Sequence, residues 1–174
     1  VGGHKGCTGL SERGRSQVEA LRDRWATTGE VGQGVVLCAS VMPRAVETAA
    51  ILAPALDVAE ADIVHDCALC EHHPGEGDGL PRATYEERYP FPAGGWAPDV
   101  RRCPGDETWN EMAERVNAAF DGLVERHAGR TVVVATHGGW IVQLMIRLLG
   151  IDPSRDGQRA WLACTNASIT EWRQ

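Results

Sequence analysis

The sequence predicts an α/β fold: a three-layer sandwich in which helices cover both faces of a mostly parallel sheet, with a small irregular lobe. Helical and strand-type patterns alternate along the chain, which is the order expected of a parallel sheet with covering helices. The run 131–136 is apolar and β-branched with no polar alternation, as in strands that are buried on both faces. Because 174 residues is the size of one domain, we expect a single domain over 1–174, with the lobe at about 72–104.

The first half of the chain predicts two helices and two strands. Ser11 is a suitable N-cap for a helix whose apolar residues share one face and which ends before Gly29. The apolar run 34–40 has the character of a short strand. Pro43 suits the first turn of the helix that follows, and a weak short strand is expected at 63–64.

The second half begins with the lobe, which is rich in proline, glycine and charge and contains a short helical piece near 85–88. Apolar residues at helical spacing predict the clearest helix of the chain over 107–127. The strand 131–136 is followed by a helix over 140–149. We expect one or two closing strands over 160–172.

Composition and charge exclude several classes of protein. The net charge of −7 argues against a nucleic-acid partner. No run approaches the roughly 18 consecutive apolar residues of a membrane helix, so we expect no membrane partner either. The six cysteines are scattered, and a domain of this size folds without disulfides, which indicates a reducing cytoplasm. One lysine against sixteen arginines, with abundant alanine and glycine, indicates a bacterial genome rich in G and C.

Two predicted strand ends could bind an anion. The first strand ends at Ser40, and Arg44 follows at the opening of a helix; the second is followed by His137, Gly138 and Gly139. Parallel sheets bind ligands at the carboxyl ends of their strands, and a helix N-terminus offers free N–H groups and partial positive charge. The planar guanidinium of Arg44 suits phosphate or carboxylate, and the glycines allow close approach.

A third candidate is Glu71, which is flanked by histidines and lies at the base of the glycine-rich lobe. A carboxyl group that burial or nearby negative charge keeps protonated can donate a proton to a leaving oxygen. Glu71 is therefore the candidate general acid.

Several stretches of the chain match the motifs of a known family in the same order. They are 9–17, 40–49, Glu71 with Gly75, Gly79 and Leu80, then 104–108, 134–139 and, as a closing strand, 166–169. Together they resemble the histidine phosphatase superfamily, the phosphoglycerate-mutase-like clan. The match extends over nearly the whole chain, and five motifs in register are much more specific than any one of them.

The resemblance implies a role for each candidate residue. Arg44 would clamp the phosphate, and His137 would be the second active-site histidine, which binds the phosphoryl oxygens. Glu71 would protonate the leaving group, Gly138 would offer a backbone donor, and Gly3 would lie where the first loop approaches substrate. The implied activity is hydrolysis of a small phosphorylated metabolite through a phosphohistidine, with no metal and no cofactor.

One part of the family pattern is absent from the sequence. The nucleophile of the family is the histidine of an Arg-His-Gly motif that ends the first strand, and this sequence contains no such triplet. His4 does not fill the role, because it follows Gly-Gly rather than a strand and an arginine. We expect the nucleophile in an N-terminal segment that precedes Val1, where the sequence starts in the middle of a loop.

Three alternatives remain open. A phosphoglycerate-type mutase would use the same residues, but mutase-like relatives have a longer, basic lobe and a tyrosine at the position of Pro74. A homologue without the nucleophile would bind phosphate and not turn it over. The alternative from another class is a zinc site formed by Cys67, Cys70, His72 and His73, with His65 nearby. Against it, a structural zinc site usually takes its ligands from two separated segments of the chain. The sequence leaves the oligomeric state open, with a homodimer as one option.

Overall fold

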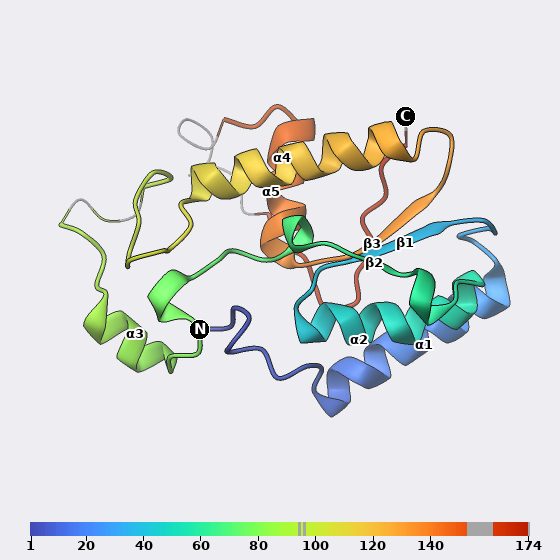
Figure 1. Cartoon of the computed structure of the whole chain (residues 1–174), viewed down its shortest axis with the longest axis horizontal. Coiled ribbons are helices and arrows are strands. Elements are labelled where there is room, and N and C mark those ends of the chain that lie inside the picture. The colour runs from blue at the N-terminus through green and yellow to red at the C-terminus, as the bar shows by residue number, and fades with distance from the viewer. Residues whose placement is uncertain (94, 96, 153–161, 174) are drawn as a thin grey trace.

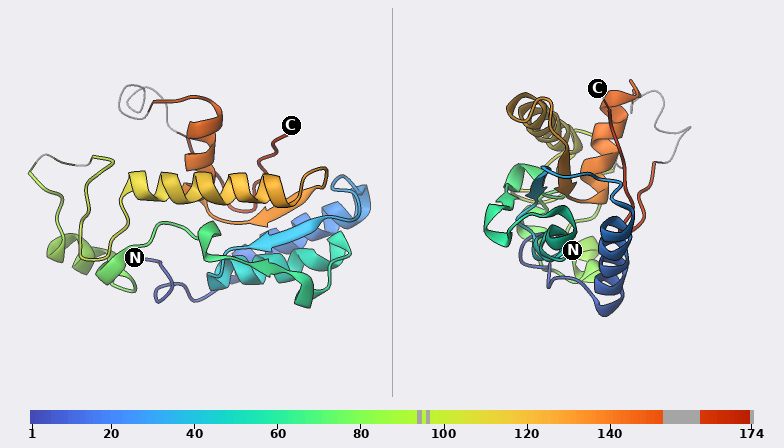
Figure 2. Two further views of the ribbon diagram at one scale, coloured as in Figure 1. Left: turned by 45° about the horizontal axis from the view of Figure 1, so that its top comes forward. Right: turned by 90° about the vertical axis from the view of Figure 1, so that its right-hand side faces the viewer.

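The computed structural model describes residues 1–93, 95, 97–152 and 162–173, and it arranges them in three layers (Figures 1 and 2). The middle layer is a parallel sheet of strands β1 (Val36–Ala39), β2 (Val64–His65) and β3 (Val132–Ala135), in the order β2-β1-β3. Helices cover both faces, as the sequence predicts. The α-helices are α1 (Glu12–Thr28), α2 (Pro43–Leu52), α3 (Arg82–Arg88), α4 (Trp109–Arg126) and α5 (Gly138–Leu148). Short 3₁₀ turns are η1 (Ala53–Leu56), η2 (Glu60–Asp62), η3 (Cys67–Leu69) and η4 (Gly75–Gly77).

The central strand β1 contributes to a hydrophobic core on each face of the sheet. Leu37 and Ala39 belong to the core formed with α1 and α2, whereas Val36 and Cys38 belong to the core formed with α4 and α5. This alternation follows from the pleat, which points successive side chains to opposite faces. All four residues of β1 are buried, so β1 is the strand buried on both faces. Burial on both faces was predicted for the run 131–136, but Val132, Val133 and Val134 of β3 are only partly buried.

The ends of two helices follow from local sequence. Ser11 caps α1 by accepting a hydrogen bond from the N–H of Gly14, and Gly29 ends the helix with φ 62, a left-handed conformation that glycine adopts without strain. Thr108 and Glu111 form a reciprocal capping box at the start of α4. The two helices, α1 and α4, lie on opposite sides of the sheet (Figure 2) and pack in different cores.

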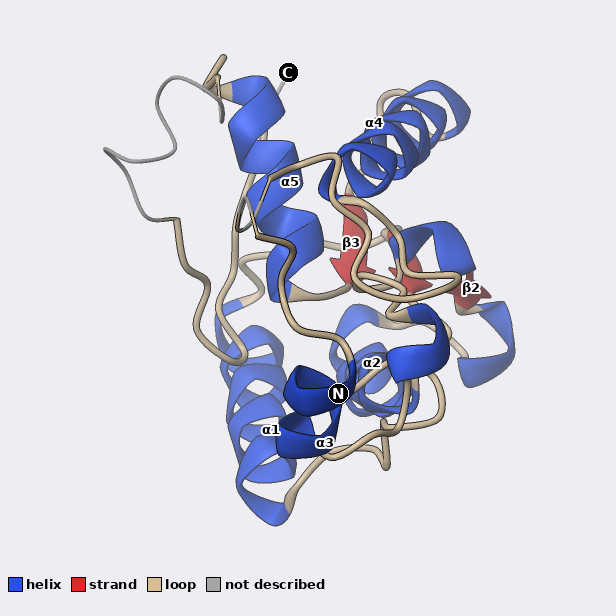
Figure 3. Ribbon diagram, turned by 90° about the vertical axis from the view of Figure 1, so that its left-hand side faces the viewer, coloured by secondary structure: helices blue, strands red, loops and turns tan. Residues whose placement is uncertain are grey.

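The segment predicted as a lobe contains η4 and α3 and lies at one end of the molecule, beside the start of the chain (Figures 1 and 3). The two segments are joined by hydrogen bonds. The N–H of Gly79 donates to the carbonyl oxygen of Val1 at 3.0 Å, and the amino group of Val1 donates to the carbonyl oxygen of Leu80. The first residues of the chain are therefore anchored to the lobe.

The predicted closing strands over 160–172 are wrong for residues 162–173, which contain no strand; residues 160 and 161 lie outside the described part of the chain. The physical reason is a turn. Ala167 adopts φ 55, and the N–H of Ser168 donates to the carbonyl oxygen of Thr165 at 3.2 Å. A left-handed residue cannot continue an extended ladder, so the branched residues around it do not pair.

Strand β3 forms one of the two edges of the sheet, and its outer side has no partner strand within the described residues. β3 pairs with β1 on one side, and Val132, Val133 and Val134 are only half-buried, whereas every residue of β1 is buried. No helix of the described residues is long and apolar enough to cross a bilayer.

Candidate active site

The carboxyl end of β1 positions Ser40 and Arg44. The N–H of Ser40 donates to the carbonyl oxygen of Ala135 at 3.0 Å, which carries the β1–β3 pairing one residue past the strands. The fully buried Ser40 side chain then accepts a hydrogen bond from the N–H of Met42 at 3.2 Å. Pro43 begins α2, so Arg44 lies in its first turn and points toward the end of β3.

His137 follows β3 and is the N-cap residue of α5. The Nε of Arg44 donates to the Nδ1 of His137 at 3.1 Å, so Nδ1 is the nitrogen without a proton. The proton is therefore on Nε2, which donates to the Oγ of Ser40 at 2.8 Å. Ser40 in turn donates to the Sγ of Cys70 at 3.2 Å. This chain of hydrogen bonds fixes both the orientation and the tautomer of the histidine.

His137 is held in its neutral form. Burial, followed by the positive charges of Arg44 and Arg115 and by His4, lowers the pKa of His137 to about 3. The imidazole is 6% exposed, so the charged form would lose nearly all its hydration. A bound dianion would favour the protonated form of His137 instead, because it would supply the negative charge that the pocket lacks.

Glu71 lies at the same helix start. Its Oε2 accepts a hydrogen bond from the N–H of Gly139 at 3.0 Å, and its Oε1 accepts one from the N–H of His72 at 3.1 Å. A Cβ atom at position 139 would be 2.2 Å from Oε1 of Glu71, so only glycine allows this approach. The carboxylate thus accepts from one N–H group of the first turn of α5, that of Gly139, two residues beyond His137.

The structure brings Arg44, Glu71 and His137 together, and Gly138 is at the opening of α5 beside them. Gly3 is placed differently. It is buried against the lobe, where a Cβ atom would be 2.7 Å from the carboxylate of Asp78, and it is the carbonyl oxygen of Gly2 that accepts a hydrogen bond from Nη1 of Arg44, at 3.4 Å.

Arg115 is a residue of this region that the sequence analysis missed. It lies on α4, and its guanidinium donates to the carbonyl oxygens of Ala68, Cys70 and Glu71 and to both carboxylate oxygens of Glu107. It ties the segment that carries Glu71 to the helix layer. Its position in a regular amphipathic helix gave no signal of this role.

Cys7 was also missed as a neighbour of the site. Burial would raise the pKa of its thiol, but the N–H groups of Gly9 and Arg44 and the guanidinium of Arg44 lower it overall. The first loop therefore brings a thiol, as well as the Gly2 carbonyl, to the guanidinium of Arg44.

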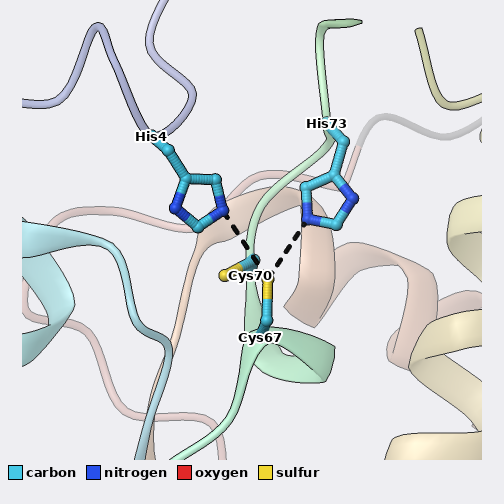
Figure 4. A group of neighbouring side chains, drawn as sticks. All are labelled: His4, Cys67, Cys70 and His73. Carbon is cyan, nitrogen blue, oxygen red and sulfur yellow. Dashed lines mark hydrogen bonds between the residues drawn. The ribbon is translucent and has the colours of Figure 1, made fainter. Parts of the chain in front are cut away.

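The pair Cys67 and Cys70 converges with two histidines, though not with the set considered from the sequence alone. His4 and His73 lie against the thiols (Figure 4). His72 instead contacts the carbonyl oxygen of Glu107, and its Nε2 is 3.5 Å from Oδ1 of Asp106. Burial and the neighbouring Cys70 raise the pKa of Cys67 to about 11, so its thiol is protonated in this arrangement.

Two cavities lie apart from the Arg44–His137 pair. One of about 370 Å³ is near the opposite ends of the strands, where Val36, Asp62 and Arg130 line it. The other, of about 250 Å³, lies under the lobe, and Arg82, Arg102, Asp106 and Glu107 are among the residues that line it. Neither cavity is lined by Arg44, Glu71 or His137 or by the candidate glycines, so the candidate site lies outside both.

Comparison with known proteins agrees with this geometry. The sequence profile of the histidine phosphatase superfamily, branch 1, matches residues 1–174. The chain belongs to the histidine phosphatase superfamily. The expectation drawn from its motifs is therefore confirmed, and so is the mixed α/β fold.

Individual relatives of this histidine phosphatase chain include both curated and solved proteins. A bifunctional protein of Mycobacterium tuberculosis is 33% identical over 134 residues, which are 76% of this chain and 35% of that protein. A metal-independent phosphoserine phosphatase of Arabidopsis thaliana is 28% identical over 80% of this chain and 58% of its own. A mycobacterial glucosyl-3-phosphoglycerate phosphatase superposes with a TM-score of 0.72 at 27% identity, over 97% of this chain and 80% of that one. The chain thus spans about a third to three-fifths of the length of these curated relatives.

Proposed function

We propose that this protein is a phosphomonoesterase that hydrolyses a small phosphorylated metabolite through a phosphohistidine intermediate. One observation carries the proposal: a neutral, buried His137 is joined to the guanidinium of Arg44 at 3.1 Å, at the start of a helix where Glu71 also lies. A permanent cation, a preorganised imidazole and helix N–H groups are what a transferring phosphoryl group requires.

Arg44 and His137 would bind the phosphoryl oxygens. In this arrangement their hydrogen bonds are made to each other and to Ser40, so a bound phosphate would exchange the Arg44–His137 contact for contacts to its own oxygens. The dianion would raise the pKa of His137 and favour the imidazolium, which stabilises the negative charge of the transition state.

Glu71 would act as the general acid in the first step and as the general base in the second. A histidine nucleophile attacks phosphorus as the bond to the leaving oxygen breaks, and the carboxylic acid of Glu71 protonates that oxygen. In the second step the carboxylate takes a proton from water, which attacks the phosphohistidine and releases inorganic phosphate. The hydrogen bonds of Glu71 to the N–H groups of Gly139 and His72 orient it for both steps.

The nucleophile is the part of the mechanism that residues 1–174 do not supply, because they contain no Arg-His-Gly motif. We propose that it comes from a segment preceding Val1. The edge of β3 that has no partner among the described residues, next to the half-buried Val132 to Val134, is a suitable place for the strand that would carry it. That strand would end beside His137.

The names of the relatives support the substrate class and the absence of a catalytic metal. Two of them act on phosphoserine and glucosyl-3-phosphoglycerate, both small organic phosphates, and one is described as metal-independent. We propose the same class of substrate here, with no nucleic-acid or membrane partner and catalysis that needs no metal. Six free cysteines support a reducing, cytoplasmic location.

A mutase is the second candidate function, since it would use the same residues. The single observation that favours it is the basic pair Arg82 and Arg102 in the cavity under the lobe, which could hold a second phosphate. However, Arg102 is already engaged by the carbonyl oxygen of Tyr89, and Asp106 and Glu107 line the same cavity. The phosphatase is the better fit.

The proposal is tested by assaying the protein encoded by the complete gene against an aryl phosphate without added metal. We expect turnover, and a loss of at least about 10²-fold in kcat for His137→Ala, as for other groups that stabilise transition-state charge. His127→Ala is the matched control, since His127 lines the cavity near the opposite ends of the strands. No turnover, or equal activity in His137→Ala and His127→Ala, would reject the assignment.

A further inference from the structure

Four potential metal ligands converge near the active site, outside the residues that the proposed reaction uses. They are His4 from the first loop and Cys67, Cys70 and His73 from the segment around η3. One ligand atom from each lies within 4.8 Å of all the others. Figure 4 shows His4 and His73 on either side of the two cysteines, with their rings directed toward the sulfur atoms.

The spacing within the cluster fits a tetrahedral ion. Zn–S bonds of about 2.3 Å and Zn–N bonds of about 2.0–2.1 Å place tetrahedral ligand atoms about 3.3–3.8 Å apart. The Sγ of Cys67 is 3.6 Å from Nε2 of His4 and 3.7 Å from Nε2 of His73. These separations match a sulfur and two nitrogens that share one ion.

Hydrogen bonding explains the close approach of these four side chains less well than a bound ion does. A thiol has one proton, so Cys67 could serve both imidazoles only by donating to one and accepting from the other. The long S···N separations are also those of weak contacts. A divalent cation would satisfy both imidazole nitrogens and both sulfur atoms at once.

We propose that His4, Cys67, Cys70 and His73 form a structural Cys₂His₂ site for zinc. Binding displaces the two thiol protons to solvent and leaves two thiolates, two neutral imidazoles and one Zn²⁺, which together carry no net charge. All four positions are taken by protein, so the site is closed and serves the fold rather than the reaction.

Neighbouring groups are placed as the outer partners of such a site. The Nδ1 of His73 is 3.9 Å from Oε2 of Glu107, so the ring presents its other nitrogen to a carboxylate that Arg115 holds in place. A carboxylate in this position orients a ligating histidine and raises its basicity. The hydroxyl of Ser40 donates to the Sγ of Cys70 at 3.2 Å, which would stabilise a thiolate there.

Local structure presents the ligands independently of any ion. Cys67 and Cys70 are brought together by the 3₁₀ turn η3, in which the N–H of Cys70 donates to the carbonyl oxygen of Cys67 at 3.0 Å. His4 is presented by a tight loop whose next two N–H groups, of Lys5 and Gly6, donate to the carboxylate of Asp78 at 2.9 and 3.0 Å. The two segments lie 63 residues apart in the sequence, so one ion would cross-link them.

The cross-link would act on the active site in two ways. It fixes the first loop, whose Gly2 carbonyl oxygen receives Nη1 of Arg44. It also fixes Cys70, which is joined through Ser40 to His137. The zinc would hold the phosphate-binding residues in position without touching substrate.

The test measures metal in the protein encoded by the complete gene, purified under reducing conditions and passed through gel filtration. We expect zinc at one equivalent per chain, and, after replacement by Co²⁺, the visible d–d bands and thiolate charge-transfer absorption of a tetrahedral cobalt–thiolate site. His4→Ala and Cys67→Ser should each weaken zinc binding by more than about tenfold, since even loss of an outer partner costs that much. His4 is exposed, so its substitution removes no buried packing.

Matched controls are His65→Ala and Cys164→Ser, which remove the same side chains from outside the cluster and should retain zinc. His137→Ala should retain zinc and lose turnover, which separates this site from the proposed reaction. Reduced protein without zinc and without the cobalt spectrum would overturn the proposal. So would zinc that His4→Ala binds as tightly as the parent, or that the controls lose equally.

Discussion

At the scale of single residues, the neutral state of His137 makes stability depend on pH. Its pKa is lowered to about 3 in the folded chain, against about 6.5 when unfolded, so the unfolded state binds the extra proton between these values. The free energy of unfolding therefore keeps its full value above about pH 6.5, the pKa of histidine in the unfolded chain. It decreases as the pH falls from about 6.5 toward 3. At pH 5 we expect this group to cost about 2 kcal/mol of unfolding free energy relative to neutral pH.

The measurement is urea unfolding at pH 7 and pH 5 for the parent and His137→Gln, a variant that does not titrate in this range. The difference between the two proteins should shrink as pH falls. A constant difference would contradict the lowered pKa. Saturating inorganic phosphate should protect the parent at pH 5, because a bound anion raises the pKa of His137.

The residue scale also shows what the sequence could predict about the site. His137 directly follows an apolar run, and Arg44 lies four residues after the end of another, so their position near the strand ends was predictable from the chain alone. Ser40 was predicted as a strand end but not as the link between His137 and Cys70, because that link depends on three segments meeting in space. His4 gave no signal as a partner of Cys67, which lies 63 residues away.

At the scale of elements, the Arg115–Glu107 pair joins α4 to the segment that carries Glu71. The two side chains are 17% and 10% exposed, and burial of Glu107 would raise its pKa, but the hydrogen bonds and charge of Arg115 lower it overall. The pair is therefore ionised and largely desolvated. Removing one member leaves an unpaired buried charge.

We expect Arg115→Met to lower the unfolding free energy by about 3–5 kcal/mol, and the double variant Arg115→Met, Glu107→Met to lose less than the single one. Denaturant unfolding measures both. Arg147→Met is the control: Arg147 joins α5 to Asp121 of α4 across an exposed pair, which contributes at most about 1 kcal/mol. A loss for Arg115→Met no larger than that of the control would show that the pair does not join the elements.

Elements were predictable where local chemistry decides them. Ser11 and Gly29 cap the two ends of α1, as the sequence predicts. The two apolar runs form β1 and β3, and each strand is slightly shorter than predicted. Branched residues suggested strands over 160–172, yet residues 162–173 contain none, and the turn at Ala167 interrupts the extended chain. Whether that segment forms a strand depends on a neighbouring strand with which it can pair, and the β-propensity of its residues carries no information about that neighbour.

At the scale of the whole molecule, the sheet order β2-β1-β3 places Arg44 and His137 on adjacent strand ends and leaves the far edge of β3 without a partner among the described residues. We propose that the strand that carries the nucleophile lies at that edge. Its histidine would then face the Arg44–His137 pair, with Glu71 at the start of α5 in reach of the leaving group.

The most direct test of this account is to trap the intermediate. In Glu71→Gln the first step with p-nitrophenyl phosphate still proceeds, because this leaving group needs no protonation, whereas water is no longer activated for the second. The protein encoded by the complete gene and carrying this substitution should accumulate acid-labile, base-stable phosphate, detected as phosphohistidine by ³¹P NMR. Unimpaired turnover in Glu71→Gln, or p-nitrophenol released without any phosphohistidine, would contradict the account.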